Sequence, residues 1–128
     1  MTDDFEKMYC GAIRRGDVLE GEIGEGKRSL LVVLQDDVLN QSLPTVLCAL
    51  IERSEKTGGA LVDEVILKSK ETGSKEDGVC LLHKIYTVRR DRIYSKKGEL
   101  SKEKLNEVYK ALDVTLGKFR DELMDDIS

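Results

Sequence analysis

The stretch from Leu30 to Leu50 constrains the fold most, because it places two short apolar runs on either side of a polar connection. The runs are Leu30–Leu34 and Val46–Ile51, five and six residues long. Apolar runs of this length, rich in valine, favour strands covered on both faces over helices. The connection, residues 35–44, contains the chain's only proline. Two such strands predict a closed or nearly closed small sheet.

The remainder of the chain predicts further strands, which give the sheet five to seven members. Four segments fit strands by alternation or by continuous apolar character: residues 13–23, 62–67, 79–86 and, across a bulge or bend, 87–93. The polar segments between them are expected to be loops or turns: residues 24–27, 52–59, 69–77 and 95–98.

Helical periodicity is clearest near the C-terminus, where apolar side chains recur at helical spacing from Leu105 to Leu123. Ser101 is the expected N-cap. Gly117 is expected to end or bend the helix, because Gly is about 1 kcal/mol less favourable than Ala in a helix interior. The stripe is expected to pack on the sheet, and its continuation past Gly117 packs there or faces a second subunit. Residues 2–10 are expected to form one or two helical turns.

Composition fits one domain in a reducing compartment. The chain has 128 residues and no run near the roughly 20 apolar residues of a membrane span. Its first residues lack the apolar run of a secretory signal. Cys10, Cys48 and Cys80 show no Cys-x-x-Cys spacing, which argues against a disulfide framework or a zinc site. The same pattern favours a location in the reducing cytoplasm. Cys48 and Cys80 lie in apolar strands and are expected to be buried.

Net charge does not decide whether the chain binds nucleic acid. The overall charge is −4, but residues 14–98 hold 15 Lys+Arg and 14 Asp+Glu. The excess acid therefore lies in the two ends, and the central region is free to carry a local basic face. Asp36 and Asp37 lack a further ligand at a telling spacing, so they are expected to support a turn or cap rather than a metal.

Three sets of residues resemble one known family. Arg15-Gly16-Asp17-Val18 matches the opening of its first strand, and Arg28 with residues 30–37, Asn40 and 44–49 matches its central strands and their connection. Residues 77–82, Thr87 and 100–116 match its last strands and closing helix. The family is the PemK/MazF toxins of toxin–antitoxin systems, and the match spans roughly residues 12–117. It implies a mainly β, SH3-like antiparallel barrel of the CcdB/PemK type with a C-terminal helix. We expect a single domain, with residues 1–11 as an N-terminal extension and 118–128 as a C-terminal helical extension.

The resemblance also implies an activity and partners. Members of the family are metal-independent endoribonucleases that cleave single-stranded RNA, act as homodimers and are inhibited by an antitoxin peptide in the dimer groove. No cofactor and no membrane are implied. Such cleavage needs a base for the ribose 2′-hydroxyl, a cation beside the phosphorane and an acid for the leaving 5′-oxygen. The alternative is a non-catalytic relative that binds nucleic acid or an antitoxin for regulation.

The family's active-site positions are partly changed here. Its strand-opening arginine is Arg28, whose guanidinium suits a phosphate. A Ser/Thr of the family falls at Glu52, and an arginine and an aspartate fall at Tyr86 and Arg89. If other residues have replaced the family's catalytic groups, we expect Glu52 to act as the base, Arg28 or Arg89 to contact the phosphate and His83 to act as the acid. Strand parity favours His83 as a core or interface residue instead, unless a bulge near Ile85 reverses it.

A basic and aromatic group surrounds these positions. The residues expected to contact nucleic acid are Lys27, Arg28, Arg53, Tyr86, Arg89, Arg90 and Arg92. Lys84 and Tyr94 lie in the same stretch of sequence as the last four. Tyrosine rings stack bases and arginines hold phosphates, which serves RNA binding with or without cleavage. The alternative is an exposed edge strand protected by its charges.

Overall fold

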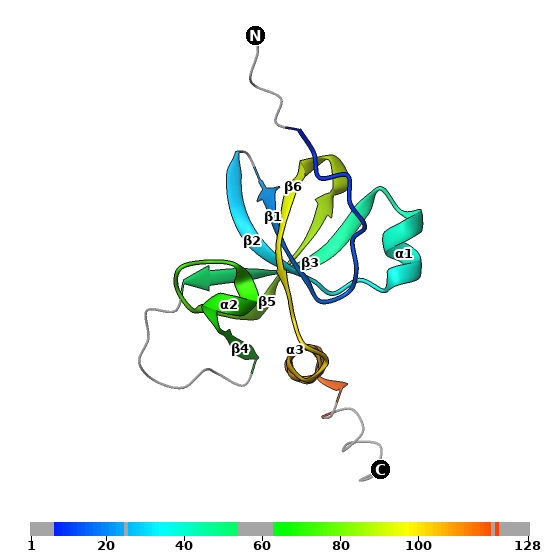
Figure 1. Cartoon of the computed structure of the whole chain (residues 1–128). Helices are drawn as coiled ribbons and strands as arrows, with labels where there is room; N and C mark the ends of the chain where they lie inside the picture. Colours follow the sequence, from blue (N-terminus) through cyan, green and yellow to red (C-terminus); the bar gives the residue numbers. More distant parts are fainter. Residues whose placement is uncertain (1–6, 25, 54–62, 119, 121–128) are drawn as a thin grey trace.

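The computed structural model describes residues 7–24, 26–53, 63–118 and 120 of the 128-residue chain. Within them, six strands form one antiparallel sheet in the order β4-β5-β3-β2-β1-β6 (Figure 1). The strands are β1 (Asp17–Ile23), β2 (Lys27–Val33), β3 (Thr45–Arg53), β4 (Glu64–Leu67), β5 (Gly78–Arg89) and β6 (Ile93–Glu99). The helices are α1 (Asp37–Ser42), α2 (Ser69–Thr72) and α3 (Lys102–Thr115), with a 3-10 turn η1 (Arg90–Arg92).

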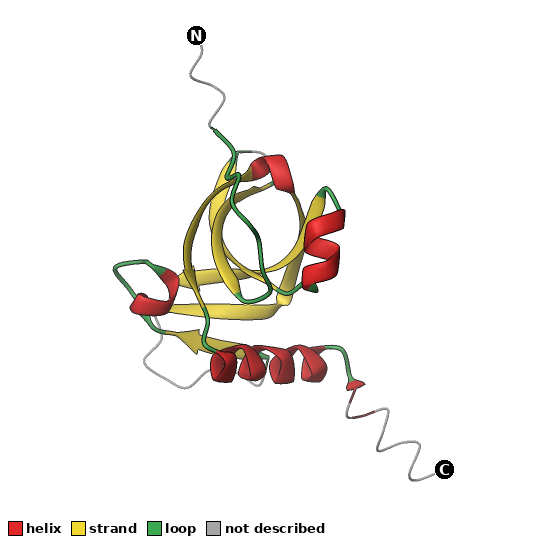
Figure 2. Ribbon diagram, turned by 45° about the vertical axis from the view of Figure 1, so that its right-hand side comes forward, coloured by secondary structure: helices red, strands yellow, loops and turns green. Residues whose placement is uncertain are grey.

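The sheet curls round into an incomplete barrel, which Figure 2 shows almost end-on. β4 and β6 are its two edges, so hydrogen bonds do not close the cylinder. The expected antiparallel barrel with a C-terminal helix is confirmed in this open form. None of the described helices is both long and apolar enough to cross a membrane.

The central strands are buried on both faces because the sheet separates two apolar cores. Alternate residues of β2 enter opposite cores, Leu31 and Val33 on one side and Val32 on the other. The core outside the curl includes Val65 of β4 and Val108 of α3. Each fully buried Leu or Val contributes about 1.5–3 kcal/mol relative to an exposed one. The sequence-based prediction of two doubly covered strands is confirmed.

The two cysteines of the apolar strands belong to these cores. Cys48 and Cys80 are fully buried, on opposite faces of the sheet. Burial raises the pKa of each thiol to about 12, because the thiolate would lose its hydration. Both cysteines are therefore small apolar packing groups, as expected.

Helix α3 begins and ends where its sequence predicts. The Ser101 hydroxyl accepts a hydrogen bond from the Lys104 backbone N–H at 3.1 Å. Gly117 follows the helix with a φ of 77°, in the left-handed region that favours glycine. Val108 and Ala111 are buried against the sheet, and the Tyr109 hydroxyl donates to the Leu34 carbonyl at 2.8 Å. The predicted continuation of the stripe at Phe119 and Leu123 lies outside the described residues.

The connection between the central strands contains a helix that the sequence did not predict. The Asp36 carboxylate caps α1 by accepting from the Val38 N–H at 3.0 Å. Asn40 is 1% exposed, and its amide donates to the Gln35 carbonyl at 2.8 Å. The expected capping role is confirmed for Asp36, whereas Asp37, in the first turn of α1, accepts from the Arg15 N–H.

Other element boundaries need correction. Residues 69–77 hold the short helix α2, and residues 95–98 belong to β6 rather than to a turn. The first strand starts at Asp17 instead of Ile13, and β3 continues through Arg53. The segment 87–93 is divided among β5, η1 and β6. Residues 7–10 are not helical, and the rest of the expected N-terminal turns and of the loop 52–59 lie outside the described residues.

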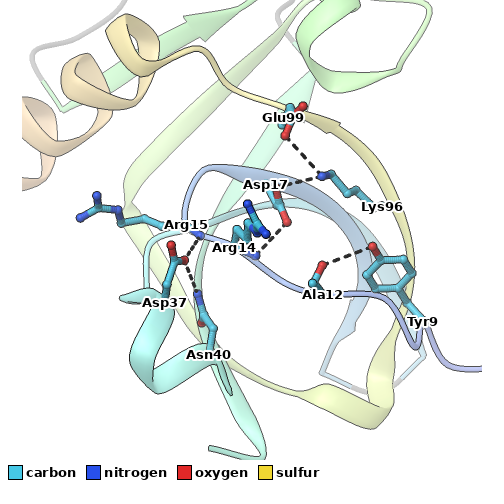
Figure 3. A network of polar contacts seen from close by, with 9 residues as sticks. All are labelled: Tyr9, Ala12, Arg14, Arg15, Asp17, Asp37, Asn40, Lys96 and Glu99. Atoms are coloured by element: carbon cyan, nitrogen blue, oxygen red, sulfur yellow. Dashed lines mark hydrogen bonds and ion pairs between the residues drawn. The ribbon is translucent and has the colours of Figure 1, made fainter. Parts of the chain in front are cut away.

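A polar network centred on the buried Asp17 joins the start of β1 to α1 and β6 (Figure 3). Asp17 is 2% exposed; one carboxylate oxygen accepts from the Arg14 N–H at 2.8 Å, and the other lies 3.3 Å from Lys96 Nζ. Asp37 accepts from the Arg15 N–H at 2.7 Å. Burial lowers the pKa of Lys96, but hydrogen bonds and the charge of Asp17 outweigh it and raise that pKa. We call this set the Asp17 network, and it fixes the Arg-Gly-Asp motif to the barrel.

Candidate active site and nucleic-acid surface

The start of β2 and the end of β3 lie side by side, because Leu30 pairs with Ile51 in the antiparallel ladder. This register brings Arg28 and Glu52, 24 positions apart in sequence, to the same end of neighbouring strands. Both line an open hollow of about 490 Å³, which we call the Arg28 hollow. Its lining residues are Lys27, Arg28, Ser29, Leu30, Leu50, Ile51, Glu52 and Arg53.

Arg28 is partly exposed and held in a defined direction. Its side chain is 38% exposed. The guanidinium carbon lies 4.3 Å from the centre of the Tyr94 ring, a cation–π contact. Nη1 also lies 4.0 Å from the Glu20 carboxylate, at the limit of an ion pair. The guanidinium is therefore oriented by its neighbours while part of it faces solvent.

Glu52 has a cationic partner, Lys84, that the sequence pattern did not predict. Lys84 Nζ lies 3.1 Å from the Glu52 carboxylate, and the two side chains are 43% and 49% exposed. A carboxylate at this position repels a phosphate unless its charge is offset. Lys84 supplies that offset, so the replacement of a hydroxyl by Glu52 is compatible with an anion in the Arg28 hollow.

A second depression of about 350 Å³ adjoins the Arg28 hollow and shares Glu52 and Arg53 with it. The segment from Thr72 to Gly78 lines its other side. Arg53 Nε lies 2.5 Å from the Glu76 carboxylate, and both side chains are more than half exposed. The two depressions together form one continuous surface with Lys27, Arg28 and Arg53 along it.

Tyr86, Arg89 and Arg92 line a separate hollow of about 280 Å³ together with the end of β1, here called the Arg92 hollow. Arg89 pairs with Asp91 at 2.6 Å, and Arg92 pairs with Glu22 at 3.1 Å. A hydrogen bond with Tyr94, and then the charge of Glu22, raise the pKa of Arg92, which stays protonated. The expected nucleic-acid residues are thus divided between two surfaces.

Arg90 is placed differently from the other arginines of this stretch. Its guanidinium donates to the Asn40 carbonyl at 2.8 Å and to the Gly11 carbonyl at 3.3 Å. These bonds join η1 to α1 and to the N-terminal segment. Arg90 therefore has a structural task that the run of basic residues did not reveal.

His83 is neither in the core nor in the described lining of the Arg28 hollow. Its side chain is 42% exposed, and Nδ1 lies 2.8 Å from the Asp63 carboxylate. The β3–β5 register passes from Ala49–Ile85 to Leu50–Leu81, which leaves residues 82–84 as a bulge and breaks the strand parity. The core alternative for His83 is wrong for this reason.

Among the described residues, one group offers the donor atoms of a metal site. One atom each from Asp63, Glu64 and His83 lies within 4.8 Å of the others. Imidazole with carboxylates suits Zn²⁺ or a related transition metal. The hydrogen bond from His83 to Asp63 accounts for the approach of that pair without an ion.

Three neighbours of Arg28, namely Tyr94, Glu20 and Glu22, were harder to identify from the sequence. Tyr94 was visible only as one aromatic residue in a basic stretch, with nothing to connect it with β2. Glu20 and Glu22 alternate along β1 and so share its outer face, which the strand pattern does predict. Their contacts with β6 depend on strand pairing, which sequence spacing does not give.

The open barrel and its hollows define a small β-barrel protein with exposed basic side chains along its surface. The family described as "PemK-like, MazF-like toxin of type II toxin-antitoxin system" matches residues 14–116. The chain is 33% identical over 111 residues to Endoribonuclease MazF of Staphylococcus saprophyticus subsp. saprophyticus, across 82% of this chain and 92% of that one. Endoribonuclease MazF of Staphylococcus epidermidis is 32% identical with the same coverage.

Solved structures agree on the fold. An endoribonuclease in complex with its cognate antitoxin, from mycobacterial species, superposes with a TM-score of 0.70 at 20% identity, covering 83% of this chain and 96% of that one. The chain therefore belongs to the PemK-like, MazF-like toxin family. The resemblance identified from its sequence motifs is confirmed.

Proposed function

We propose that this protein is a metal-independent endoribonuclease that cleaves single-stranded RNA at the Arg28 hollow. The observation that carries the proposal is that Arg28 and Glu52 both line one open hollow together with Lys27 and Arg53. Family membership and the relatives named as endoribonucleases support the reaction class.

The proposed chemistry is an in-line attack of the ribose 2′-hydroxyl on the adjacent phosphorus. Glu52 accepts the hydroxyl proton as general base, with its charge offset in the resting protein by Lys84. Arg28 stabilises the charge that develops on the phosphorane oxygens. The P–O bond to the leaving 5′-oxygen breaks, and that oxygen takes a proton from water in the open hollow. The products carry a 2′,3′-cyclic phosphate and a 5′-hydroxyl.

The basic side chains along the surface extend the RNA contact. Lys27 and Arg53 line the same hollow as Arg28 and Glu52, where they can hold flanking phosphates. Tyr86, Arg89 and Arg92 provide a second contact surface in the Arg92 hollow. His83 is left out of the proposed mechanism because it hydrogen-bonds Asp63 instead of lining the Arg28 hollow.

We further propose a cytoplasmic homodimer that an antitoxin peptide inhibits. The mycobacterial structure named above contains an endoribonuclease with its cognate antitoxin. In this chain α1 and the adjoining part of β3 expose apolar side chains that a second copy can cover: Val38, Leu39, Leu43 and Leu47.

The proposal is tested with purified protein and a long single-stranded RNA in excess EDTA. We expect cleavage, and a loss of about 100-fold or more in Arg28→Ala, the scale of removing one transition-state donor. Lys110→Ala removes one exposed positive charge from α3 and serves as the matched control, with cleavage unchanged. If no cleavage occurs that depends on Arg28, the catalytic proposal is wrong.

The second candidate is a non-catalytic RNA- or antitoxin-binding regulator. One observation favours it: the family's hydroxyl position holds Glu52, and Lys84 already engages that carboxylate. Labelled RNA that binds in the Arg28 hollow and is recovered intact would support this function over cleavage.

A further inference from the structure

The outer face of β1 carries two acidic side chains between basic and aromatic neighbours. Glu22 lies opposite Arg28 in the β1–β2 ladder, and Glu20 lies opposite Ser95 in the β1–β6 ladder. The start of β2 and the middle of β6 are therefore brought together across β1. This arrangement connects the Arg28 hollow with a strand that contributes no residue to its described lining.

Glu22 fixes the position of the Tyr94 ring. One of its carboxylate oxygens accepts a hydrogen bond from the Tyr94 hydroxyl at 3.1 Å, and the other pairs with Arg92 at 3.1 Å. The Glu22 side chain is only 18% exposed, so water competes little for these contacts. The ring is therefore held at both ends, by its hydroxyl on Glu22 and by its backbone in β6.

The face of that ring meets Arg28. The guanidinium carbon is 4.3 Å from the ring centre, well inside the range of a cation–π contact. An arginine side chain loses considerable rotamer freedom when it is held in one geometry. Because Glu22 already holds the ring, Arg28 loses part of its rotamer freedom before any ligand binds.

We propose that Tyr94 is a positioning residue that orients the guanidinium of Arg28 toward the phosphodiester. The inference rests on the proposed function of the Arg28 hollow and adds a residue outside it. Tyr94 acts through the face of its ring, and Glu22 acts by holding the ring. Bidentate contact with a phosphate requires the guanidinium plane to be aligned, which is the property that stacking on a ring controls.

The test compares Tyr94→Leu, which removes the ring, with Tyr94→Phe, which keeps it. In steady-state cleavage we expect Tyr94→Leu to lower kcat about 10-fold with KM changed less than 2-fold, because a misaligned donor weakens transition-state contacts. Tyr94→Phe retains the ring face and is expected within about 3-fold of the wild type. In an Arg28→Ala background, Tyr94→Leu is expected to have no further effect on kcat, since the group it positions is gone.

A second readout is independent of activity. Nitrogen-15 relaxation of the Arg28 side-chain Nε–H should show more motion in Tyr94→Leu than in Tyr94→Phe or the wild type, with equal melting temperatures confirming that each variant is folded. Unchanged Arg28 mobility and kcat in Tyr94→Leu would overturn the inference, as would an equal loss in the Arg28→Ala background. Failure of the proposed function looks different: the wild type itself leaves RNA intact, while the relaxation comparison still decides the role of Tyr94.

Discussion

The Asp17 network and the Arg28 hollow are both built from charged residues of β1, β2 and their neighbours, yet they differ in burial. Asp17 is 2% exposed, and its two oxygens are engaged by Arg14 and Lys96. Arg28 is 38% exposed on its side chain and opens onto a hollow of about 490 Å³. The first set of charges is used inside the fold, and the second set faces solvent.

This difference separates a family motif whose charges are used within the fold from an arginine whose side chain stays accessible to a ligand. The Arg-Gly-Asp motif is satisfied within the chain, because its aspartate accepts from the Arg14 backbone N–H and the backbone N–H of Arg15 donates to Asp37 (Figure 3). Buried charges are tolerated only with such partners. Arg28 has the same formal charge as Lys96, but 38% of its side chain is exposed and it lines a hollow that a ligand can reach.

Asp17→Asn should have the largest effect on stability. It removes a buried charge that faces Lys96, at a cost of about 3 kcal/mol and roughly 10 °C in Tm. Glu99→Gln is the matched control: its side chain is 71% exposed beside the same lysine, so a change below about 0.5 kcal/mol is expected. Thermal and urea unfolding measure both. Equal losses of unfolding free energy in the two variants would contradict the contrast drawn between the Asp17 network and the Arg28 hollow.

Glu52→Gln should separate chemistry from binding within the Arg28 hollow. Loss of the proposed base lowers single-turnover cleavage by about 100-fold. RNA binding should hold or tighten, because one negative charge facing the phosphates is removed. Quench-flow cleavage and fluorescence anisotropy measure the two effects. A variant that cleaves like the wild type would remove Glu52 from the mechanism.

Arg53 and Arg90 should separate a binding arginine from a structural one. Arg53→Ala is expected to weaken RNA binding and to reduce the slope of log K against log salt by about 0.7, one single-strand phosphate contact. Arg90→Ala removes bonds to two backbone carbonyls and is expected to cost about 1–3 kcal/mol of stability with the salt slope unchanged. Anisotropy titrations at several salt concentrations and urea unfolding give both numbers. If Arg90→Ala changed the salt slope and Arg53→Ala lowered the stability instead, Arg90 would be the binding residue and Arg53 the structural one.

Much of the architecture could be predicted because it depends on local pattern. Doubly buried valine-rich strands, a Ser101 cap and Gly117 at the helix end are all readable from neighbouring residues. The helix α1 was missed because Asn40 and Asp37 order it through contacts with Gln35 and Arg15, outside its own sequence. β6 was read as a turn since Ser, Lys and Gly dominate residues 95–98, a composition that also protects an edge strand.

The site was predictable only in part. Arg28 and Glu52 lie on strands whose pairing follows from the central motif, so their placement at the same end of neighbouring strands could be expected. The separation of Tyr86 and Arg89 from them could not, because it depends on how far the sheet curls. The three-residue bulge at 82–84 also places Lys84 toward Glu52 and His83 toward Asp63. One extra residue in a strand reverses the face of all that follow, and no spacing rule reveals it.

The most direct test of the account is a chemical-shift titration of nitrogen-15-labelled protein with a single-stranded oligonucleotide whose 2′-hydroxyls are methylated, so that it binds without being cleaved. The account predicts the largest backbone shifts at residues 27–30 and 50–53, with residues 14–17 and 35–40 nearly unmoved. Largest shifts at the Asp17 network, or at the Arg92 hollow with none at Arg28, would contradict it.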